Sequence, residues 1–244
     1  MSPALSRDTL ESLLRDRKLD HTLTRQDADP LTTRWLVPTG VAGLDARLEG
    51  GMPRGHVSEV VGPRSSGRLS ILVSALAGAT ARGEAVALVD PLDMFDPVSA
   101  SASGIDFQRM LWIRGDAVSS ARVSLSCEYG TLQKTLDRAV KALNIVLQAG
   151  GFGLVVLDLG EVAVQTIKRL PYTTWLRLHR VIEGSDTACV LIGSEPIARS
   201  AGGVTIQLAS GSRLQAPGLN ARVIRAKKME SDRDVCVSLS APAC

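Results

Sequence analysis

Short apolar runs alternate along the chain with longer segments in which apolar residues recur every three or four positions. The short runs are rich in β-branched residues and end at Gly, Pro or Ser, which is typical of buried strands. The longer segments have the spacing of amphipathic helices. The expected strands are 57–61, 85–90, 111–114, 154–158, 188–193 and 204–208, and the expected helices are 69–82, 131–148 and 172–183.

The order of these elements predicts the fold class. Strands that are apolar throughout and alternate with helices indicate an α/β fold, with a mostly parallel central sheet covered by helices on both faces. The last stretch is different, because 221–228 and 234–239 flank the polar turn 230–233. This pattern predicts a C-terminal antiparallel hairpin at one edge of the sheet.

Residues 6–18 predict an amphipathic helix outside this core. One helix cannot bury its own apolar face, so it must pack on the core or on another protein. A polar stretch ending at Pro30 follows and is expected to be a linker. The chain is therefore expected to consist of an N-terminal helix and linker, 1–35, and a core domain, 36–244. The leucines of the apolar face, which we expect to bind a partner, are Leu10, Leu13 and Leu14.

Composition excludes several classes of protein. The 244 residues are 45% hydrophobic and 22% charged, which is ordinary for a globular protein, and no apolar run approaches the ~20 residues that span a bilayer. The first twenty residues mix charges where a signal peptide has an apolar stretch. The four cysteines include no C-x-x-C pair, so neither a disulfide framework nor a metal site is expected. We expect a cytoplasmic protein with no membrane partner.

Positive charge is concentrated toward the C-terminus. Residues 161–244 carry eleven basic and seven acidic groups, although the whole chain has a net charge of only +3. Exposed strand edges use such clusters to prevent stray pairing, and nucleic-acid sites use them to bind phosphate. The cations that we consider for DNA contact are Lys168, Arg169 and Arg199 in expected loops, supported by Arg222, Arg225, Lys227 and Lys228.

The segment 62–70 lies between a strand and a helix, which is the context of a phosphate-binding P-loop. A functional P-loop reads G-x-x-x-x-G-K-[ST], in which the Lys reaches phosphate and the hydroxyl holds magnesium. Gly62 and Gly67 have the required spacing, but Arg68 stands at the Lys position and Leu69 at the hydroxyl position. A leucine offers magnesium no oxygen. The loop is therefore expected to be a structural turn that does not support ATP hydrolysis.

Passive binding of an anion or nucleotide at this loop remains an open alternative. The apolar strand that ends at Asp158 has the form of a magnesium-coordinating element, whereas Ser70 is rotated ~100° away from the hydroxyl position. We expect no cofactor, with ATP and magnesium as the alternative. The residues of this degenerate site are Gly62, Ser65, Ser66, Gly67, Arg68, Ser70 and Asp158.

Several further motifs occur in one order, and together they resemble the RecA recombinase family. The resemblance covers 37–115 closely and 150–210 loosely, and it implies a RecA-like P-loop core. Its motifs are 39–45, 50–56, Glu59, 62–63, 65–67, 89–90, 96–97 and 202–204.

The chain departs from the RecA pattern at positions that would carry chemistry. RecA-like ATPases have a catalytic Glu shortly after the strand ending at 89–90, and here Leu92 takes that position. A leucine cannot orient water or accept its proton. Asp93 replaces the Glu only after a shift of one residue, and the glutamine that senses phosphate in RecA is altered near 193–195. The resemblance with these losses implies a protein that is not an enzyme.

The two DNA-binding loops implied by the resemblance correspond to 160–171 and 195–203. Both are shorter than in RecA and neither contains an aromatic residue for base stacking. Binding to single-stranded DNA is therefore expected to be weak and sensitive to salt.

The stretch 148–159 and the loop ending in Arg-Leu-Ser resemble the ImuA subgroup of diverged RecA-like proteins. ImuA proteins act in SOS-induced translesion synthesis. The resemblance implies as partners an ImuB-like Y-family polymerase homologue, an error-prone polymerase and RecA, with a location near the nucleoid. Because the N-terminal helix of RecA docks on the adjacent subunit, it also implies self-association or partner docking through the N-terminal leucines.

Three functions follow from these observations. The first, which we prefer, is a non-catalytic accessory protein of a translesion polymerase complex. The second is a weak DNA-stimulated ATPase, which requires Arg68, Ser70 and Asp158 to rebuild a magnesium site. The third is an inhibitor of cell division similar to SulA, whose diverged RecA-like core the chain also resembles.

Overall fold

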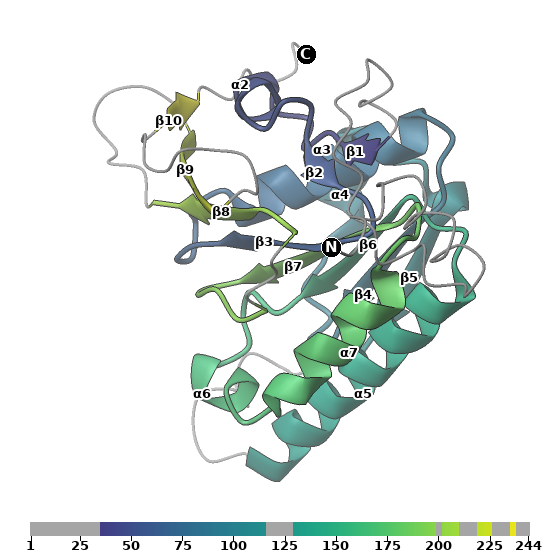
Figure 1. The fold of residues 1–244 in the computed structure, drawn as a ribbon, viewed down its shortest axis with the longest axis vertical. Coiled ribbons are helices and arrows are strands. Elements are labelled where there is room, and N and C mark those ends of the chain that lie inside the picture. The colour runs from purple at the N-terminus through teal and green to yellow at the C-terminus, as the bar shows by residue number, and fades with distance from the viewer. Residues whose placement is uncertain (1–34, 116–128, 199–201, 210–218, 226–234, 238–244) are drawn as a thin grey trace, which may run out of the picture. The chain divides into compact units, whose positions relative to one another are not determined.

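The computed structural model describes residues 35–115, 129–198, 202–209, 219–225 and 235–237. Within them, eight strands form one sheet in the order β10-β9-β8-β3-β7-β6-β4-β5 (Figure 1). Strands β3 to β8 are parallel to one another, and β9 and β10 are antiparallel. Their bounds are Val57–Val61 (β3), Val86–Asp90 (β4), Met110–Arg114 (β5), Leu154–Asp158 (β6), Ala188–Gly193 (β7), Thr205–Leu208 (β8), Leu219–Arg225 (β9) and Val235–Val237 (β10).

Helices cover both faces of this sheet. Helix α3 (Arg68–Ala81) packs on one face, and α5 (Tyr129–Ala149) and α7 (Tyr172–Ile182) lie together on the other (Figure 1). A small antiparallel pair, β1 with β2, precedes β3. The shorter elements are β1 (Leu36–Val37), β2 (Met52–Pro53), α2 (Ala42–Arg47), α4 (Pro97–Ala102), a 3₁₀ turn (Phe107–Arg109) and α6 (Val164–Ile167).

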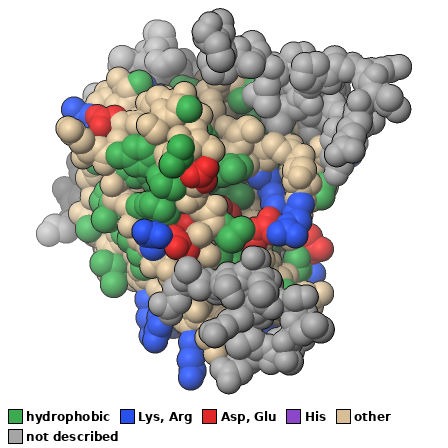
Figure 2. All heavy atoms as spheres, turned by 180° about the vertical axis from the view of Figure 1, so that it is seen from behind, with side chains coloured by type: hydrophobic (Ala, Val, Ile, Leu, Met, Phe, Trp, Pro, Cys, Tyr) green, Lys and Arg blue, Asp and Glu red, His purple; other side chains and the backbone are tan. Residues whose placement is uncertain are grey.

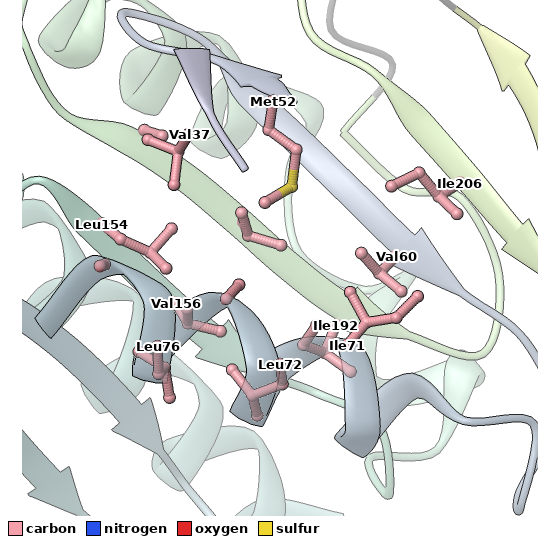
Figure 3. Packing of buried hydrophobic residues seen from close by; sticks show 14 of the residues in the cluster. Val37, Met52, Val60, Ile71, Leu72, Leu76, Leu154, Val156, Ile192 and Ile206 are labelled. Atoms are coloured by element: carbon pink, nitrogen blue, oxygen red, sulfur yellow. The ribbon is translucent and has the colours of Figure 1, made fainter. Parts of the chain in front are cut away.

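Strand β6 explains why the sheet is buried on both faces. Its side chains point alternately to opposite sides. Leu154 and Val156 belong to the hydrophobic layer under α3, whereas Val155 and Leu157 belong to the layer under α5 and α7. Figure 3 shows the first layer, where α3 side chains gather against apolar side chains of several strands. The uniformly apolar strands of the sequence are thus the strands of a sheet sandwiched between helices.

The predicted α/β fold with a mostly parallel sheet and an antiparallel hairpin is confirmed. The main strands and helices agree with their predicted bounds within about two residues. Of the predicted hairpin strands, the described parts are 219–225 and 235–237. The short elements were not predicted, because a helix of four to six residues contains too few positions to display a period. The predicted N-terminal helix with Leu10, Leu13 and Leu14 lies outside the described residues.

The expectation that 160–171 is a loop is wrong in part. Val164–Ile167 forms helix α6, and Val162, Ile167 and Leu170 are buried in the hydrophobic layer under α5 and α7. Tertiary packing of these three side chains decides the structure of the segment. Little of it is left to move as a free DNA-binding loop.

The described surface is not uniformly polar. Figure 2 shows the molecule from behind the view of Figure 1, and hydrophobic side chains gather there between scattered charged ones. Exposed apolar residues of the described chain include Val98 and Phe107, which line a shallow hollow with Pro97, Ser101 and Ala102. Among the helices that the structure describes, none is long and apolar enough to cross a membrane.

Candidate functional site

The candidate site lies where the parallel strands end at their carboxyl edge. Strand β3 lies between β7 and β8, and the loop that follows it approaches the end of β7, where the Gly62 amide donates to the Gly193 carbonyl oxygen at 3.1 Å. Strands β4 and β6 end at the same edge with Asp90 and Asp158. Parallel α/β sheets bind ligands in the crevice outside this edge. The topology therefore brings the predicted loop and the predicted acid together.

The loop 62–67 has the backbone of an anion-binding turn. Gly67 adopts a left-handed conformation with φ of 94° directly before α3, and a Cβ atom at Gly62 would lie 2.6 Å from the carbonyl oxygen of Leu208. Both positions therefore need glycine. Because the first amides of a helix have no partner within the helix, the start of α3 offers donors to an anion.

The side chain at the P-loop lysine position is turned toward the connection between β6 and α6. Arg68 Nη1 donates to the Gly160 carbonyl oxygen at 3.0 Å, and Nη2 lies 3.4 Å from Glu161 Oε1. The Arg68 side chain is only 8% exposed. Arg64, which is largely exposed, forms an ion pair with the other oxygen of Glu161. Both arginines of the loop are thus bound to one carboxylate of the same chain.

Asp158 lies beside this cluster. Its Oδ1 accepts a hydrogen bond from the Gly160 amide at 2.8 Å. Burial raises the pKa of the Asp158 carboxyl to about 6, and the negative charges of Asp90 and Glu161 act in the same direction. The Gly160 hydrogen bond and the charge of Arg68 oppose this shift.

The serines and the leucine of the loop differ in exposure. Leu69, at the hydroxyl position, is 50% exposed, and Ser65 and Ser70 are exposed as well. Ser66 is buried, and its Oγ has no hydrogen-bond partner among the described residues. The residues present do not fit magnesium and ATP in the manner of a P-loop, since the cation at the lysine position is bound internally and the magnesium position holds a leucine.

Leu92, which takes the position of the catalytic Glu of RecA-like ATPases, lies in the hydrophobic interior. Leu92 is buried in the layer under α5. Asp93 forms a two-point ion pair with Arg114, at 2.7 Å to Nε and 2.8 Å to Nη2, and these hydrogen bonds lower the pKa of Asp93. A carboxylate with a lowered pKa is a weaker base. Asp90, at the end of β4, uses its carboxylate to accept the amides of Met94 and Phe95.

A buried glutamate on β3 positions the connection between β7 and β8. Glu59 Oε1 accepts hydrogen bonds from the amides of Ile197 at 2.7 Å and Ala198 at 2.9 Å. The sequence singled out Glu59 only as part of the RecA resemblance. Sequence analysis did not identify Glu161. The feature that could have identified it is an acidic residue three positions after Asp158, on the connection that faces the P-loop-like turn.

The predicted DNA-contact residues do not all come together. Lys168 follows α6, and its Nζ lies 3.0 Å from Glu195 Oε2, so this ion pair joins the two segments predicted to bind DNA. Arg169 is exposed beside it. Arg222 is on β9, opposite Gln207 of β8, and three strands separate β9 from β6, a spacing of roughly 19 Å. Only the backbone of Arg225 is described, and Arg199, Lys227 and Lys228 lie outside the described residues.

Comparison with known proteins agrees with this geometry. Residues 24–124 match the RecA N-terminal domain. Protein RecA from Thermus aquaticus is 31% identical over 160 residues, which cover 64% of this chain and 45% of that protein. Protein RecA from Nostoc sp. is 40% identical over 85 residues, 35% of this chain and 24% of that protein. The chain thus spans less than half the length of these relatives.

The fold has a solved counterpart. The crystal structure of the RadB recombinase superposes with a TM-score of 0.57, covering 82% of this chain and 94% of that one, at 15% sequence identity. This similarity concerns the fold alone. Residues 24–124 of this chain are therefore similar to the RecA N-terminal domain, and its α/β core has the fold of the RadB recombinase.

Proposed function

We propose that this protein is a RecA-like accessory protein that does not hydrolyse ATP and that serves a DNA-damage-tolerance polymerase complex. The observation that carries the proposal is the position of Arg68, whose guanidinium donates to Gly160 and pairs with Glu161. In a functional P-loop the cation at this position reaches the β- and γ-phosphates. A cation bound within the protein leaves the loop as a structural turn of the RecA-like core.

The surroundings of the loop support the same proposal. Leu69 offers no oxygen to magnesium, Leu92 is buried where a catalytic base is required, and Asp93 is bound to Arg114. Hydrolysis needs a group that orients water and accepts its proton. Among the described residues at these positions, no acid is left for that role.

The proposed partners follow from the resemblance to ImuA. They are an ImuB-like polymerase homologue, an error-prone polymerase and single-stranded DNA bound weakly, and RecA itself is a further candidate. The contact of Lys168 with Glu195 supports a DNA edge formed by the segments after β6 and β7. Partial neutralisation of Lys168 by Glu195 is consistent with weak binding.

The test is phosphate release and thermal stabilisation by millimolar Mg-ATP, each with and without single-stranded DNA. We expect neither phosphate release nor a shift in melting temperature for the native protein. A ligand at about 100 times its dissociation constant stabilises by about 2.7 kcal/mol, which melting detects readily. The matched variant R68K/L69T/E161Q restores the lysine and the hydroxyl of the P-loop and neutralises the carboxylate that pairs with position 68, and we expect it to gain stabilisation by Mg-ATP without phosphate release.

Phosphate release by the native protein that is lost in Arg68→Ala would overturn the proposal and identify a weak ATPase. If the protein binds neither DNA at low salt nor a polymerase partner, the result would instead favour the alternative function, inhibition of cell division.

A further inference from the structure

The loop 62–70 contains two cations, Arg64 and Arg68, and both are bound to the same side chain. Glu161 offers one carboxylate oxygen to each arginine. Guanidinium groups bind carboxylate and phosphate with the same charge-assisted hydrogen bonds. Glu161 therefore provides the loop with the kind of anion that a phosphate-binding turn recognises.

The connection after β6 is shaped to hold this carboxylate in place. Gly160 donates its amide to Asp158 and accepts from Arg68 through its carbonyl oxygen. A Cβ atom at Gly160 would lie 3.0 Å from Asp158 Oδ1 and 3.4 Å from Arg68 Cζ, so a side chain there would press on the cluster. The close approach of Arg68 to the backbone fixes the neighbouring Glu161 next to the loop.

The loop itself keeps the conformation of an anion site. Gly67 remains left-handed before α3, and the Oγ of Ser66 is buried with no hydrogen-bond partner in the described part of the chain. A buried hydroxyl without a partner is costly, and such a group usually faces a ligand or water. The loop thus combines a retained turn, an unsatisfied donor and two cations that Glu161 occupies.

We propose that Glu161 is a built-in anion of this loop, which occupies Arg64 and Arg68 and thereby excludes polyphosphate anions from the turn. This inference goes beyond the proposed function, because it states what replaces the ligand and does not depend on the polymerase partners. It follows that neutralising Glu161 converts the loop into a polyphosphate site. The site so exposed takes the anion without magnesium, since Leu69 contributes no metal ligand.

Isothermal titration of the full chain with inorganic tripolyphosphate in magnesium-free buffer tests this proposal. We expect Glu161→Gln to bind at least about tenfold more tightly than the native protein, as one freed charge-assisted contact is worth about that factor. The double variant R64A/E161Q should lose most of this gain. The matched control is Glu195→Gln, which removes one acid from another ion pair at the same edge of the sheet, and it should bind like the native protein.

Equal affinity of Glu161→Gln and the native protein would overturn the proposal. An equal gain in Glu195→Gln would also overturn it, by showing a general effect of net charge. If Glu161→Gln does not fold, Arg64→Ala decides the question. Because Glu161 already occupies Arg64, this variant should bind tripolyphosphate as weakly as the native protein does. A tenfold loss would show that Arg64 binds anions in the native state and would refute the proposal. Failure of the native protein to bind a polymerase partner would refute only the proposed function.

Discussion

Three charged residues at the carboxyl edge of the sheet have partners that stabilise the fold. Arg68 is bound to the connection after β6, Asp90 accepts two backbone amides, and Asp93 is paired with Arg114. Each of them stands at or near a position where RecA-like ATPases act on nucleotide. Hydrogen bonds to buried charged groups contribute about 1.5–3 kcal/mol each, which applies to Arg68 and Asp90. The pair of Asp93 with Arg114 is open to solvent and contributes less.

Asp158 is expected to reduce stability at neutral pH. The pKa of Asp158 is raised from 3.8 to about 6, so the folded state favours the protonated carboxyl. The protonated carboxyl therefore contributes to stability at low pH, and this contribution is lost as the pH rises from about 4 to about 6. This shift corresponds to about 3 kcal/mol at pH 7 and above. Asp158→Asn keeps the acceptor for the Gly160 amide and carries no charge. We expect it to be more stable than the native protein near pH 8 and equally stable near pH 4.

Urea unfolding at both pH values measures this difference, with Asp137→Asn on the exposed side of α5 as the control. A native protein that is more stable than Asp158→Asn at pH 8 would show that Arg68 and Gly160 favour the ionised carboxylate more than burial disfavours it.

At the scale of elements, the connections after the strands are held by side chains from other elements of the core. Glu59 of β3 binds the connection between β7 and β8, and Arg68 of α3 binds the connection between β6 and α6. At the opposite edge, Arg54 donates to the carbonyl oxygens of Gly153 and Asp186 and pairs with Glu84. Burial favours the neutral form of Glu84, but its hydrogen bonds with Arg82 and Arg54 outweigh this and lower its pKa.

Glu59→Ala is expected to loosen the connection between β7 and β8. The change removes the acceptor of the Ile197 and Ala198 amides, and leaving these two groups unsatisfied costs about 2–6 kcal/mol in total. Glu59→Gln retains one acceptor oxygen and should lose less. The measurements are urea unfolding and hydrogen exchange at these two amides. Unchanged exchange in Glu59→Ala would mean that the carboxylate does not hold this connection.

At the scale of the whole molecule, the predicted DNA contacts are divided between two parts of the sheet. Lys168 and Arg169 follow β6, whereas Arg222 lies on β9 beyond three intervening strands. A short stretch of single-stranded DNA that contacts Lys168 and Arg169 can therefore bind without contacting Arg222. The edge formed by the connections after β6 and β7 is therefore the place to test first.

Reversing charge at this edge in the variant K168E/R169E/R199E is expected to abolish binding to single-stranded DNA. In the native protein these three phosphate contacts should give a slope of roughly −2 in log affinity against log salt. Fluorescence anisotropy over a salt series measures both quantities. The control is Arg109→Glu, just before β5 and hence at the amino edge of the sheet. Unchanged affinity in the triple variant, or an equal loss in the control, would refute the assignment.

The N-terminal leucines carry a prediction about assembly that concerns residues outside the described structure. Leu13→Asp, like deletion of 1–30, should abolish self-association and weaken partner binding by placing a charge on the apolar face of the predicted helix. Ser12→Asp is the matched control, since Ser12 is about 200° around the helix from Leu10. Sedimentation analysis measures the assembly, and an unchanged mass for both Leu13→Asp and the deletion would contradict the docking role.

Local pattern was sufficient to predict the parallel core of this chain. Strands that are apolar throughout must be buried on both faces, and amphipathic helices must bury one face. A sheet between two layers of helices meets both requirements. The turn at 62–67 was also predictable, because the spacing of Gly62 and Gly67 is itself the geometric requirement. The substitutions at Arg68 and Leu69 were visible in the sequence for the same reason.

Only the tertiary structure decided what the substituted residues do. Arg68 and Glu161 are 93 positions apart, and they meet because β6 ends at the same edge as the loop after β3. Glu59 and the Ile197 amide are 138 positions apart, and Arg54 and the Asp186 carbonyl oxygen are 132 positions apart. Strand order sets which connections become neighbours, and ion pairs then form between whichever charges face each other. Sequence periodicity indicates the strand order only in outline. It does not indicate which charged side chains will form ion pairs.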